Sequence, residues 1–196
     1  MYDVIIIGAG PAGLFSAYEL IKNNKKLKIL LLDKGKYAKI RFCPIAESKE
    51  ECKNCKPCQI LSGYGGAGTF SDGKLNFIPK LGKSDLFKYM SISEAYKLID
   101  DTEDIFNKFQ MDSDVYPSNI NDAKKIQEKV AKVGANLLVI KQKHLGSDHL
   151  PEYIDGICDY LVENGVTLID RADVTDIKTI DEDNHEVTYV TGSKET

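Results

Sequence analysis

The sequence predicts an α/β fold of three layers, in which a parallel β-sheet is covered on both faces. The first observation is the continuous apolar run Val4–Ile7, because a parallel strand buried on both faces lacks polar alternation. The second is a helix-like stretch that follows it, with Leu14, Ala17 and Ile21 on one face. The third is another apolar run at residues 27–33, with the helix placed between the two strands. Strand, helix and strand in this order predict a parallel sheet.

A glycine-rich turn, "GAGPAG", joins the first predicted strand to the helix, and Asp33 ends the second strand twenty positions after Gly13. Together these elements form a dinucleotide-binding fingerprint of the Rossmann-like type. Gly8 allows the tight turn, Gly10 lets a pyrophosphate approach the helix N-terminus, and Gly13 lets helix and strand pack closely. The Asp33 carboxylate is expected to accept hydrogen bonds from ribose hydroxyls, and its charge argues against a 2′-phosphate.

The residues predicted to bind the cofactor in this region are Gly8, Gly10, Pro11, Ala12, Gly13, Asp33 and Lys34. The spacing alone does not separate FAD from NAD, because both sites use the same mechanics. The form "DVIIIGAGPAGL" resembles the FAD-binding start of the glutathione-reductase-type flavoprotein superfamily.

A cysteine-rich segment and a glycine-rich loop follow one another after the second predicted strand. The cysteines are Cys43, Cys52, Cys55 and Cys58, and the loop reads "GGAGTFSDGKL" from Gly65. Both features, with "KHLGSDHLPEYIDGICDYLVENGV" further on, resemble a family of uncharacterised FAD-dependent dehydrogenases of bacteria and archaea over essentially the whole chain.

The resemblance implies further FAD contacts. It places the glycine-rich loop against the pyrophosphate or flavin, Val174 against the adenine, and Arg41 near the phosphates. The loop residues concerned are Gly65, Gly66, Ala67, Gly68 and Thr69. Independently, glycines at this density permit positive φ angles and turn successive N–H groups into an anion-binding nest.

The spacing of Cys52, Cys55 and Cys58, with Cys43 as a fourth thiol, suits a [4Fe–4S] cluster. Zinc in Cys₄ coordination is the close alternative, although it more often uses two separated C-x2-C pairs. A redox thiol pair beside lysines and a plain loop of reduced cysteines also remain open. Cys158 lies on a predicted helix face with apolar neighbours and is expected in the core.

We expect three parts of the chain: residues 1–80 as the first half of the FAD-binding domain, 81–147 as a mainly helical insertion, and 148–196 as the return to that domain. Ser91 and Glu94 form the pattern of a capping box. Residues 135–142 are predicted as a strand, and a helix is predicted to begin between Ser147 and Pro151 and to end at Gly165. The FAD-binding fold is expected to be incomplete at the C-terminus, and the chain is expected to be a fragment of a longer protein.

The chain has a formal net charge of -4 and scattered lysines, so no nucleic acid or membrane partner is indicated. It shows no secretory signal or transmembrane span, and the 5 cysteines are an odd number, so we expect a cytoplasmic protein with reduced thiols. His144, Asp148 and His149 match no ligand template, and Asp148 is expected to be a helix N-cap or a first-turn acid.

The sequence therefore predicts the FAD-binding region of a flavin-dependent oxidoreductase, an enzyme without a side-chain nucleophile. Its small-molecule substrate or electron acceptor is unidentified, and NAD(P)H is the candidate reductant. The alternatives are a non-enzymatic FAD- or metal-binding module and an NAD-dependent dehydrogenase.

Overall fold

The computed structural model describes residues 1–48, 50–146, 148–192 and 194–195. The chain divides into two compact units. Unit 1 comprises Met1–Ser71 and Asp148–Thr196, and unit 2 comprises Asp72–Ser147. Ser147, one limit of the predicted helix start, lies outside the described residues.

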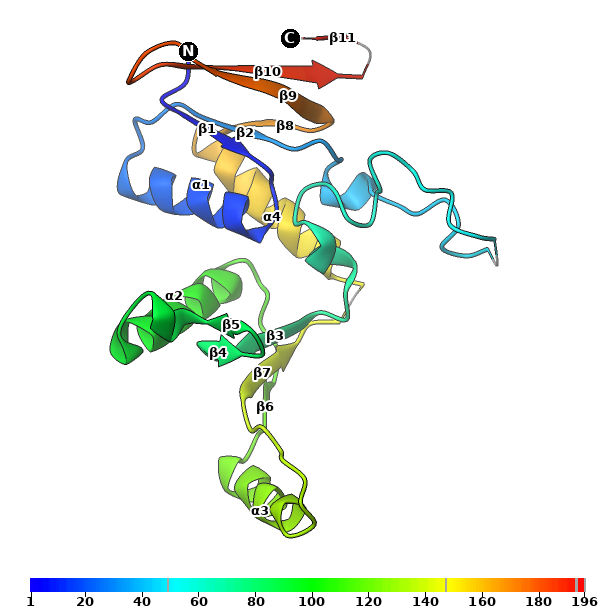
Figure 1. The fold of residues 1–196 in the computed structure, drawn as a ribbon, viewed down its shortest axis with the longest axis vertical. Coiled ribbons are helices and arrows are strands. Elements are labelled where there is room, and N and C mark those ends of the chain that lie inside the picture. The colour runs from blue at the N-terminus through cyan, green and yellow to red at the C-terminus, as the bar shows by residue number, and fades with distance from the viewer. Residues whose placement is uncertain (49, 147, 193, 196) are drawn as a thin grey trace. The chain divides into compact units, whose positions relative to one another are not determined.

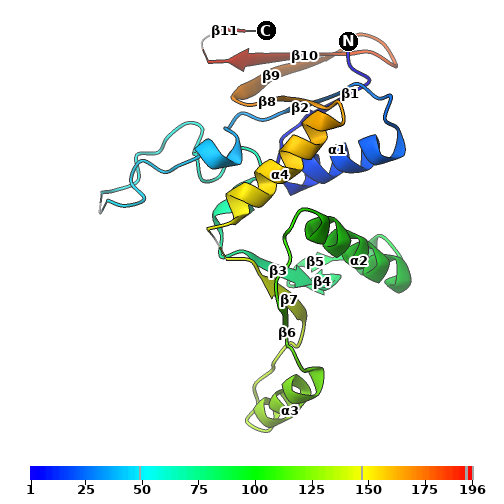
Figure 2. The same cartoon turned by 180° about the vertical axis from the view of Figure 1, so that it is seen from behind.

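The centre of unit 1 is a parallel sheet of strand order β1-β2-β8, with helices α1 and α4 packed side by side on one face (Figure 1; Figure 2). The bounds are β1 Val4–Ile7, α1 Pro11–Asn23, β2 Ile29–Leu32, α4 Leu150–Glu163 and β8 Thr167–Ile169. Helix α1 buries Leu14, Ala17, Tyr18 and Ile21, the face that its periodicity predicts. All four residues of β2 are buried, as a strand covered on both faces requires.

The other face of this sheet carries an antiparallel sheet of order β11-β10-β9 (Figure 1). Its strands are β9 Ala172–Thr179, β10 His185–Thr191 and β11 Lys194–Glu195. Val174, Val187 and Tyr189 pack against Leu30 and Leu32 of the parallel sheet. Helices, parallel sheet and antiparallel sheet therefore form three layers, and the predicted α/β fold class is confirmed.

Unit 2 combines helices with short antiparallel strands in the order β3-β7-β6, with β4 and β5 as a separate pair. The bounds are β3 Lys74–Phe77, β4 Lys80–Leu81, β5 Ser84–Asp85, η3 Leu86–Lys88, α2 Ile92–Lys108, β6 Val115–Tyr116, α3 Ile120–Ala131 and β7 Lys141–His144. The predicted capping box is confirmed, because the Ser91 and Glu94 side chains each accept the other residue's backbone N–H.

Two local predictions are wrong. The strand predicted at residues 135–142 is displaced, because β7 extends only where β3 and β6 supply ladder partners, from Lys141 to His144. Asp148 is neither the N-cap nor a first-turn acid of α4: the N-cap position is His149, whose side chain makes no capping bond, and the acid in the first turn is Glu152. Pro151 in the first turn starts the helix instead, because its fixed φ suits that position and its missing N–H costs nothing there.

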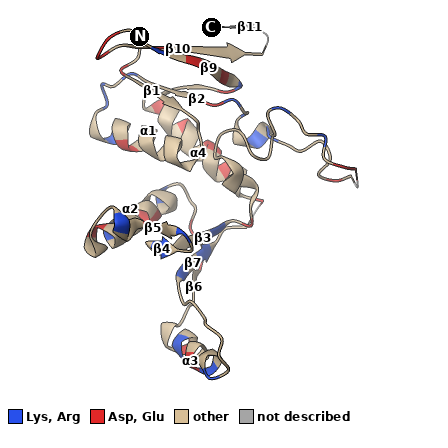
Figure 3. Cartoon of the chain, in the orientation of Figure 1, with Lys and Arg blue, Asp and Glu red and all other residues tan. Residues whose placement is uncertain are grey.

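The interior of unit 2 contains a charge cluster. Lys143 of β7 is 3% exposed, and its ammonium donates to Asn107 Oδ1 at 2.7 Å and to Asp112 Oδ1 at 2.5 Å. Glu103 of α2 pairs with both Lys143 and Lys141 of β7. Figure 3 shows the basic residues of β7 in blue and the acidic residues of α2 in red. These partners raise the pKa of Lys143, although burial alone opposes that shift. No described helix is both long and apolar enough to cross a lipid bilayer.

Candidate nucleotide-binding site

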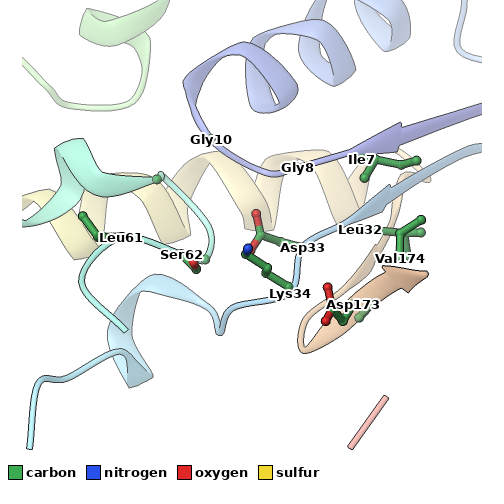
Figure 4. A pocket seen from close by; sticks show the side chains of 13 residues that line it. Ile7, Gly8, Gly10, Leu32, Asp33, Lys34, Leu61, Ser62, Asp173 and Val174 are labelled. Carbon is green, nitrogen blue, oxygen red and sulfur yellow. The ribbon is translucent and has the colours of Figure 1, made fainter. Parts of the chain in front are cut away.

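A cavity of about 380 Å³ lies in unit 1 where the parallel strands β1 and β2 end (Figure 4). It is lined by Ile7, Gly8, Gly10, Leu32, Asp33, Lys34, Leu61, Ser62, Gly63, Gly66, Ala172, Asp173 and Val174. The carboxyl ends of parallel strands are where α/β sheets bind ligands, because the loops diverge there and leave a crevice. The position of this cavity therefore follows from the topology of the sheet.

The three glycines of the first turn have different physical roles. Gly8 has a φ of 101°, a conformation that favours glycine. A Cβ at Gly13 would lie 1.9 Å from the Gly8 carbonyl oxygen, so close packing of helix on strand requires a glycine there. A Cβ at Gly10 would meet no atom within 4 Å, although Gly10 lines the cavity. Its missing side chain leaves the backbone open to a ligand.

The N-terminus of α1 faces this cavity through its N-cap, Gly10. Pro11 occupies the first helical position, and the first turn carries no acidic residue. The unpaired N–H groups and the positive end of the helix dipole therefore favour an anion. This is the local chemistry that a pyrophosphate needs.

The Asp33 carboxylate is held against the glycine turn. Its Oδ2 accepts the Ala9 N–H at 2.8 Å, and its Oδ1 accepts the Gly35 N–H at 2.7 Å. Figure 4 shows the side chain between the turn and Lys34. Each oxygen keeps a further lone pair, so the oriented carboxylate can accept ribose hydroxyls.

A second glycine segment, Gly63–Gly68, meets the same cavity and is held by Arg41. The Arg41 side chain is 3% exposed and donates to four backbone carbonyls, with distances of 2.7 to 2.9 Å. The acceptors are Gln59, Ile60, Tyr64 and Gly66. Burial lowers the pKa of Arg41, and the nearby Asp33 charge opposes that shift. Arg41 thus holds a wall of the cavity but is not among the residues that line it.

Tyr64 anchors the same segment to the sheet. It is fully buried, donates its hydroxyl to the Leu31 carbonyl at 3.0 Å and stacks on Tyr37 with ring centroids 4.6 Å apart. Burial raises the pKa of Tyr64 well above its usual value, so the phenol remains a neutral donor. The backbone N–H of Gly65 donates to the Ala9 carbonyl at 2.8 Å, which ties the two glycine segments together.

The positive φ angles predicted for this loop are present at Gly65 (82°) and Gly66 (67°). Their N–H groups, however, donate to the carbonyls of Ala9 and Gly63. The predicted anion nest is therefore wrong for these two residues, because their donors are used to fix the loop.

The structure brings six of the predicted cofactor residues to the cavity wall: Gly8, Gly10, Asp33, Lys34, Gly66 and Val174. The others do not line it: Pro11, Ala12, Gly13, Arg41, Gly65, Ala67, Gly68 and Thr69. Contact of any of them with a cofactor stays a prediction. Sequence reasoning missed Ile7 and Leu32, although their places at strand ends signal them, and it missed Leu61, Ser62 and Asp173.

The four cysteines predicted as metal ligands are free thiols in this structure. Cys52 and Cys55 are exposed, and Cys43 and Cys58 are half-buried. Within the described ranges, no group of three or more His, Cys, Asp or Glu side chains is arranged to hold a metal ion. The arrangement present does not fit an iron–sulfur or zinc site. Cys158 is buried as predicted, and burial raises the pKa of its thiol to about 12.

The two histidines flagged in the sequence have separate surroundings. His144 Nε2 lies 2.8 Å from the Asp72 carbonyl oxygen, and the ring of His149 lies beside Glu152 at 3.8 Å. The His149 contact is local, the His144 contact joins residues 72 positions apart in the sequence, and neither histidine belongs to the cavity lining.

Comparison with known proteins shows what the glycine-turn region of this chain is similar to. A family model for an FAD binding domain matches residues 3–42, which include β1, the glycine turn, α1, β2 and Asp33. Residues 3–42 are thus similar to an FAD binding domain. An uncharacterised protein of Methanosarcina barkeri is 48% identical over 42 residues, which are 21% of this chain and 10% of that protein.

Two solved structures share the fold. A 3-ketosteroid-Δ4-(5α)-dehydrogenase from Rhodococcus jostii RHA1 aligns with a TM-score of 0.54 and 13% identity, covering 99% of this chain and 43% of the other. A glycine oxidase from Geobacillus kaustophilus aligns with a TM-score of 0.52 and 14% identity, covering 99% and 52%. At these identities the likeness establishes the fold alone. The chain spans about half the length of these structures or less.

Proposed function

We propose that this chain is the FAD-binding region of a flavin-dependent oxidoreductase. One observation carries the proposal: a helix N-terminus without acids, an open Gly10 and an oriented Asp33 carboxylate meet in one cavity at the end of a parallel sheet. This combination serves the two polar parts of a dinucleotide, because the helix end favours a pyrophosphate and the carboxylate accepts ribose hydroxyls. Both groups belong to the region that the FAD-binding family model matches.

In this proposal the chain's own residues bind and orient the cofactor. Gly8 and Gly10 leave the backbone accessible to the pyrophosphate, Asp33 holds the adenosine ribose, and Val174 supplies an apolar wall for the adenine. Gly66 closes the cavity beside Gly10: a Cβ there would lie 3.4 Å from the Gly10 Cα. The bound flavin supplies the hydride or electron chemistry, with NAD(P)H as the proposed reductant and a small-molecule acceptor.

The first test is a binding experiment. We expect the full chain to quench the fluorescence of added FAD and to bind FAD at least about tenfold more tightly than NAD⁺, a difference of about 1.4 kcal/mol. Gly10→Val should weaken this binding without unfolding the protein, because the space beside Gly10 is open. Tight binding of NAD⁺ with no uptake of FAD would replace the proposal by an NAD-dependent dehydrogenase.

A second measurement separates an oxidoreductase from a binding module. FAD-loaded protein is mixed with NADH or NADPH in the absence of oxygen, and the visible flavin absorption is followed. Loss of that absorption, with recovery when an electron acceptor is added, supports the oxidoreductase. Dithionite is the positive control and should bleach the flavin. If the absorption stays stable with NADH and NADPH but is lost with dithionite, the result supports a module that binds FAD without using it.

A further inference from the structure

The cysteine segment contains a second cavity, of about 420 Å³, beside the nucleotide cavity. Cys55, Lys56, Pro57 and Cys58 form one side of it. Lys34, Leu61, Ser62 and Asp173 form the other side, and these four residues also line the nucleotide cavity. The two cavities therefore share a wall. Two of the four clustered cysteines, Cys55 and Cys58, line this second cavity, whereas Cys43 and Cys52 do not.

The backbone connects these thiols to the nucleotide cavity. The Cys58 carbonyl accepts the N–H of Leu61 at 3.2 Å and of Ser62 at 2.9 Å, and both residues line the two cavities. Arg41 fixes the two carbonyls in between, those of Gln59 and Ile60. A displacement of Cys58 is therefore transmitted to the cavity wall through a single short turn.

We propose that Cys55 and Cys58 are a redox-active thiol pair that closes to a disulfide and reshapes the wall of the nucleotide cavity. The thiols lie three residues apart, the C-x-x-C spacing of thiol–disulfide exchange proteins. Cys55 is exposed and Cys58 half-buried, so Cys55 is the attacking thiol and Cys58 the resolving one. Lys34 and Lys56 outnumber the one acid of the lining, Asp173, and this excess of positive charge favours an anionic low-molecular-weight disulfide as the oxidant.

The exchange proceeds in two balanced steps. The Cys55 thiolate attacks one sulfur of the low-molecular-weight disulfide, forms a mixed disulfide and releases one thiol. The Cys58 thiolate then attacks the Cys55 sulfur, forms the protein disulfide and releases the second thiol. Two electrons and two protons pass from the protein to the reagent. The closed loop has fewer conformations, so we expect it to hold the shared wall more rigidly and to bind FAD more tightly.

The test treats the reduced full chain with oxidised glutathione and counts free thiols. We expect the number to fall from 5 to three, since one disulfide uses two thiols, with a Cys55–Cys58 linkage in the peptide map. Cys58→Ser should stop at a stable glutathione adduct on Cys55, and Cys55→Ser should form no internal disulfide. The matched control is Cys52→Ser, which changes an exposed thiol outside the cavity and should still form the disulfide.

The affinity readout rests on the proposed function, and the thiol readout does not. We expect the oxidised form to bind FAD about threefold more tightly than the reduced form, and Cys55→Ser to lose this difference. Three results would overturn the thiol pair: a disulfide that includes Cys52, five free thiols remaining after treatment, or stoichiometric zinc or iron in the reduced protein. A Cys55–Cys58 disulfide with unchanged FAD affinity overturns the reshaping of the wall. Absence of FAD binding in both states overturns the proposed function. The free-thiol count and the peptide map then still decide whether Cys55 and Cys58 form a disulfide.

Discussion

The two glycine segments of the nucleotide cavity are held in different ways. The first, Gly8–Gly13, is fixed by the backbone: the Gly8 N–H donates to the Leu32 carbonyl at 2.7 Å, and the Leu14 N–H donates to the Gly10 carbonyl at 3.0 Å. The second, Gly63–Gly68, has backbone bonds as well, but it is also held by one buried cation, Arg41, which donates to the Tyr64 and Gly66 carbonyls 23 and 25 residues away in the sequence. The contacts of the first segment therefore lie within one strand–helix–strand unit, and the second also requires a side chain from outside its own loop.

The largest expected effect tests the close packing of the first segment. Gly13→Ala places a Cβ 1.9 Å from the Gly8 carbonyl oxygen, which cannot move without breaking the turn. We expect the free energy of unfolding in urea to fall by about 3 kcal/mol. The control Gly10→Ala meets no atom and should cost less than about 1 kcal/mol. Equal losses for the two variants would contradict the separate roles of these glycines.

Arg41→Met tests the second segment. It leaves four backbone carbonyls, one buried and three part-buried, without this donor, and we expect a loss of about 2–3 kcal/mol in the free energy of unfolding. Amide hydrogen exchange should accelerate at Tyr64–Gly66 and remain unchanged at Gly8–Gly13. Arg171→Met is the matched control, because that exposed arginine pairs with its neighbour Asp170, and the variant should cost less than about 0.5 kcal/mol. Faster exchange in both glycine segments would show that Arg41 does not act selectively.

Asp33→Asn tests the group that lies between the segments. The variant keeps the shape of the side chain but loses the charge, and one acceptor facing a backbone N–H becomes an amide donor. We expect FAD affinity to fall about tenfold and the free energy of unfolding to fall by about 1 kcal/mol, measured by fluorescence titration and urea unfolding. Asp173→Asn, which changes an exposed acid of the same cavity, should have a smaller effect on both. The reverse ranking would move the ribose site to Asp173.

The smallest expected effect concerns pH. Asp155 of α4 is buried beside η1 (Ala38–Ile40), and burial raises its pKa, with the ammonium of Lys39 at 3.6 Å opposing the shift. A carboxyl whose pKa is higher in the folded state stabilises the fold below its unfolded pKa of about 3.9, and this contribution is lost as pH rises through the folded pKa. Asp155→Asn should therefore gain stability relative to the unmodified chain between about pH 4 and pH 7. If the free energies of unfolding of the two proteins differ by the same amount at every pH, the raised pKa of Asp155 is contradicted.

The first segment was predictable because every signal is local. The apolar runs, the spacing of Gly8, Gly10 and Gly13, and the position of Asp33 lie within a single strand–helix–strand unit. The second segment was predictable only in its composition. Nothing near Arg41 shows that its side chain folds inward to bind carbonyls, because those acceptors belong to a loop without periodicity.

The same physical reason explains the other differences from prediction. The length of β7 depends on where its ladder partners lie, and the propensity of residues 135–140 does not supply a partner. The cysteine spacing predicts soft ligands, but it does not state which thiols face one cavity. Positions such as Leu61 and Ser62 enter the site through the backbone of a distant turn, which a one-dimensional pattern does not encode.

The first and last strands of unit 2, β3 and β7, lie next to each other. Lys74 pairs with His144 in antiparallel register, and the Leu145 N–H donates to the Gly73 carbonyl at 2.9 Å. The chain thus leaves and returns through neighbouring strands about 5 Å apart, a gap that a two-residue hairpin turn can bridge. Unit 2 therefore has the connectivity of an exchangeable cassette: segments of other lengths can be inserted or removed at this point in evolution or by engineering, with the remaining chain joined over a single turn.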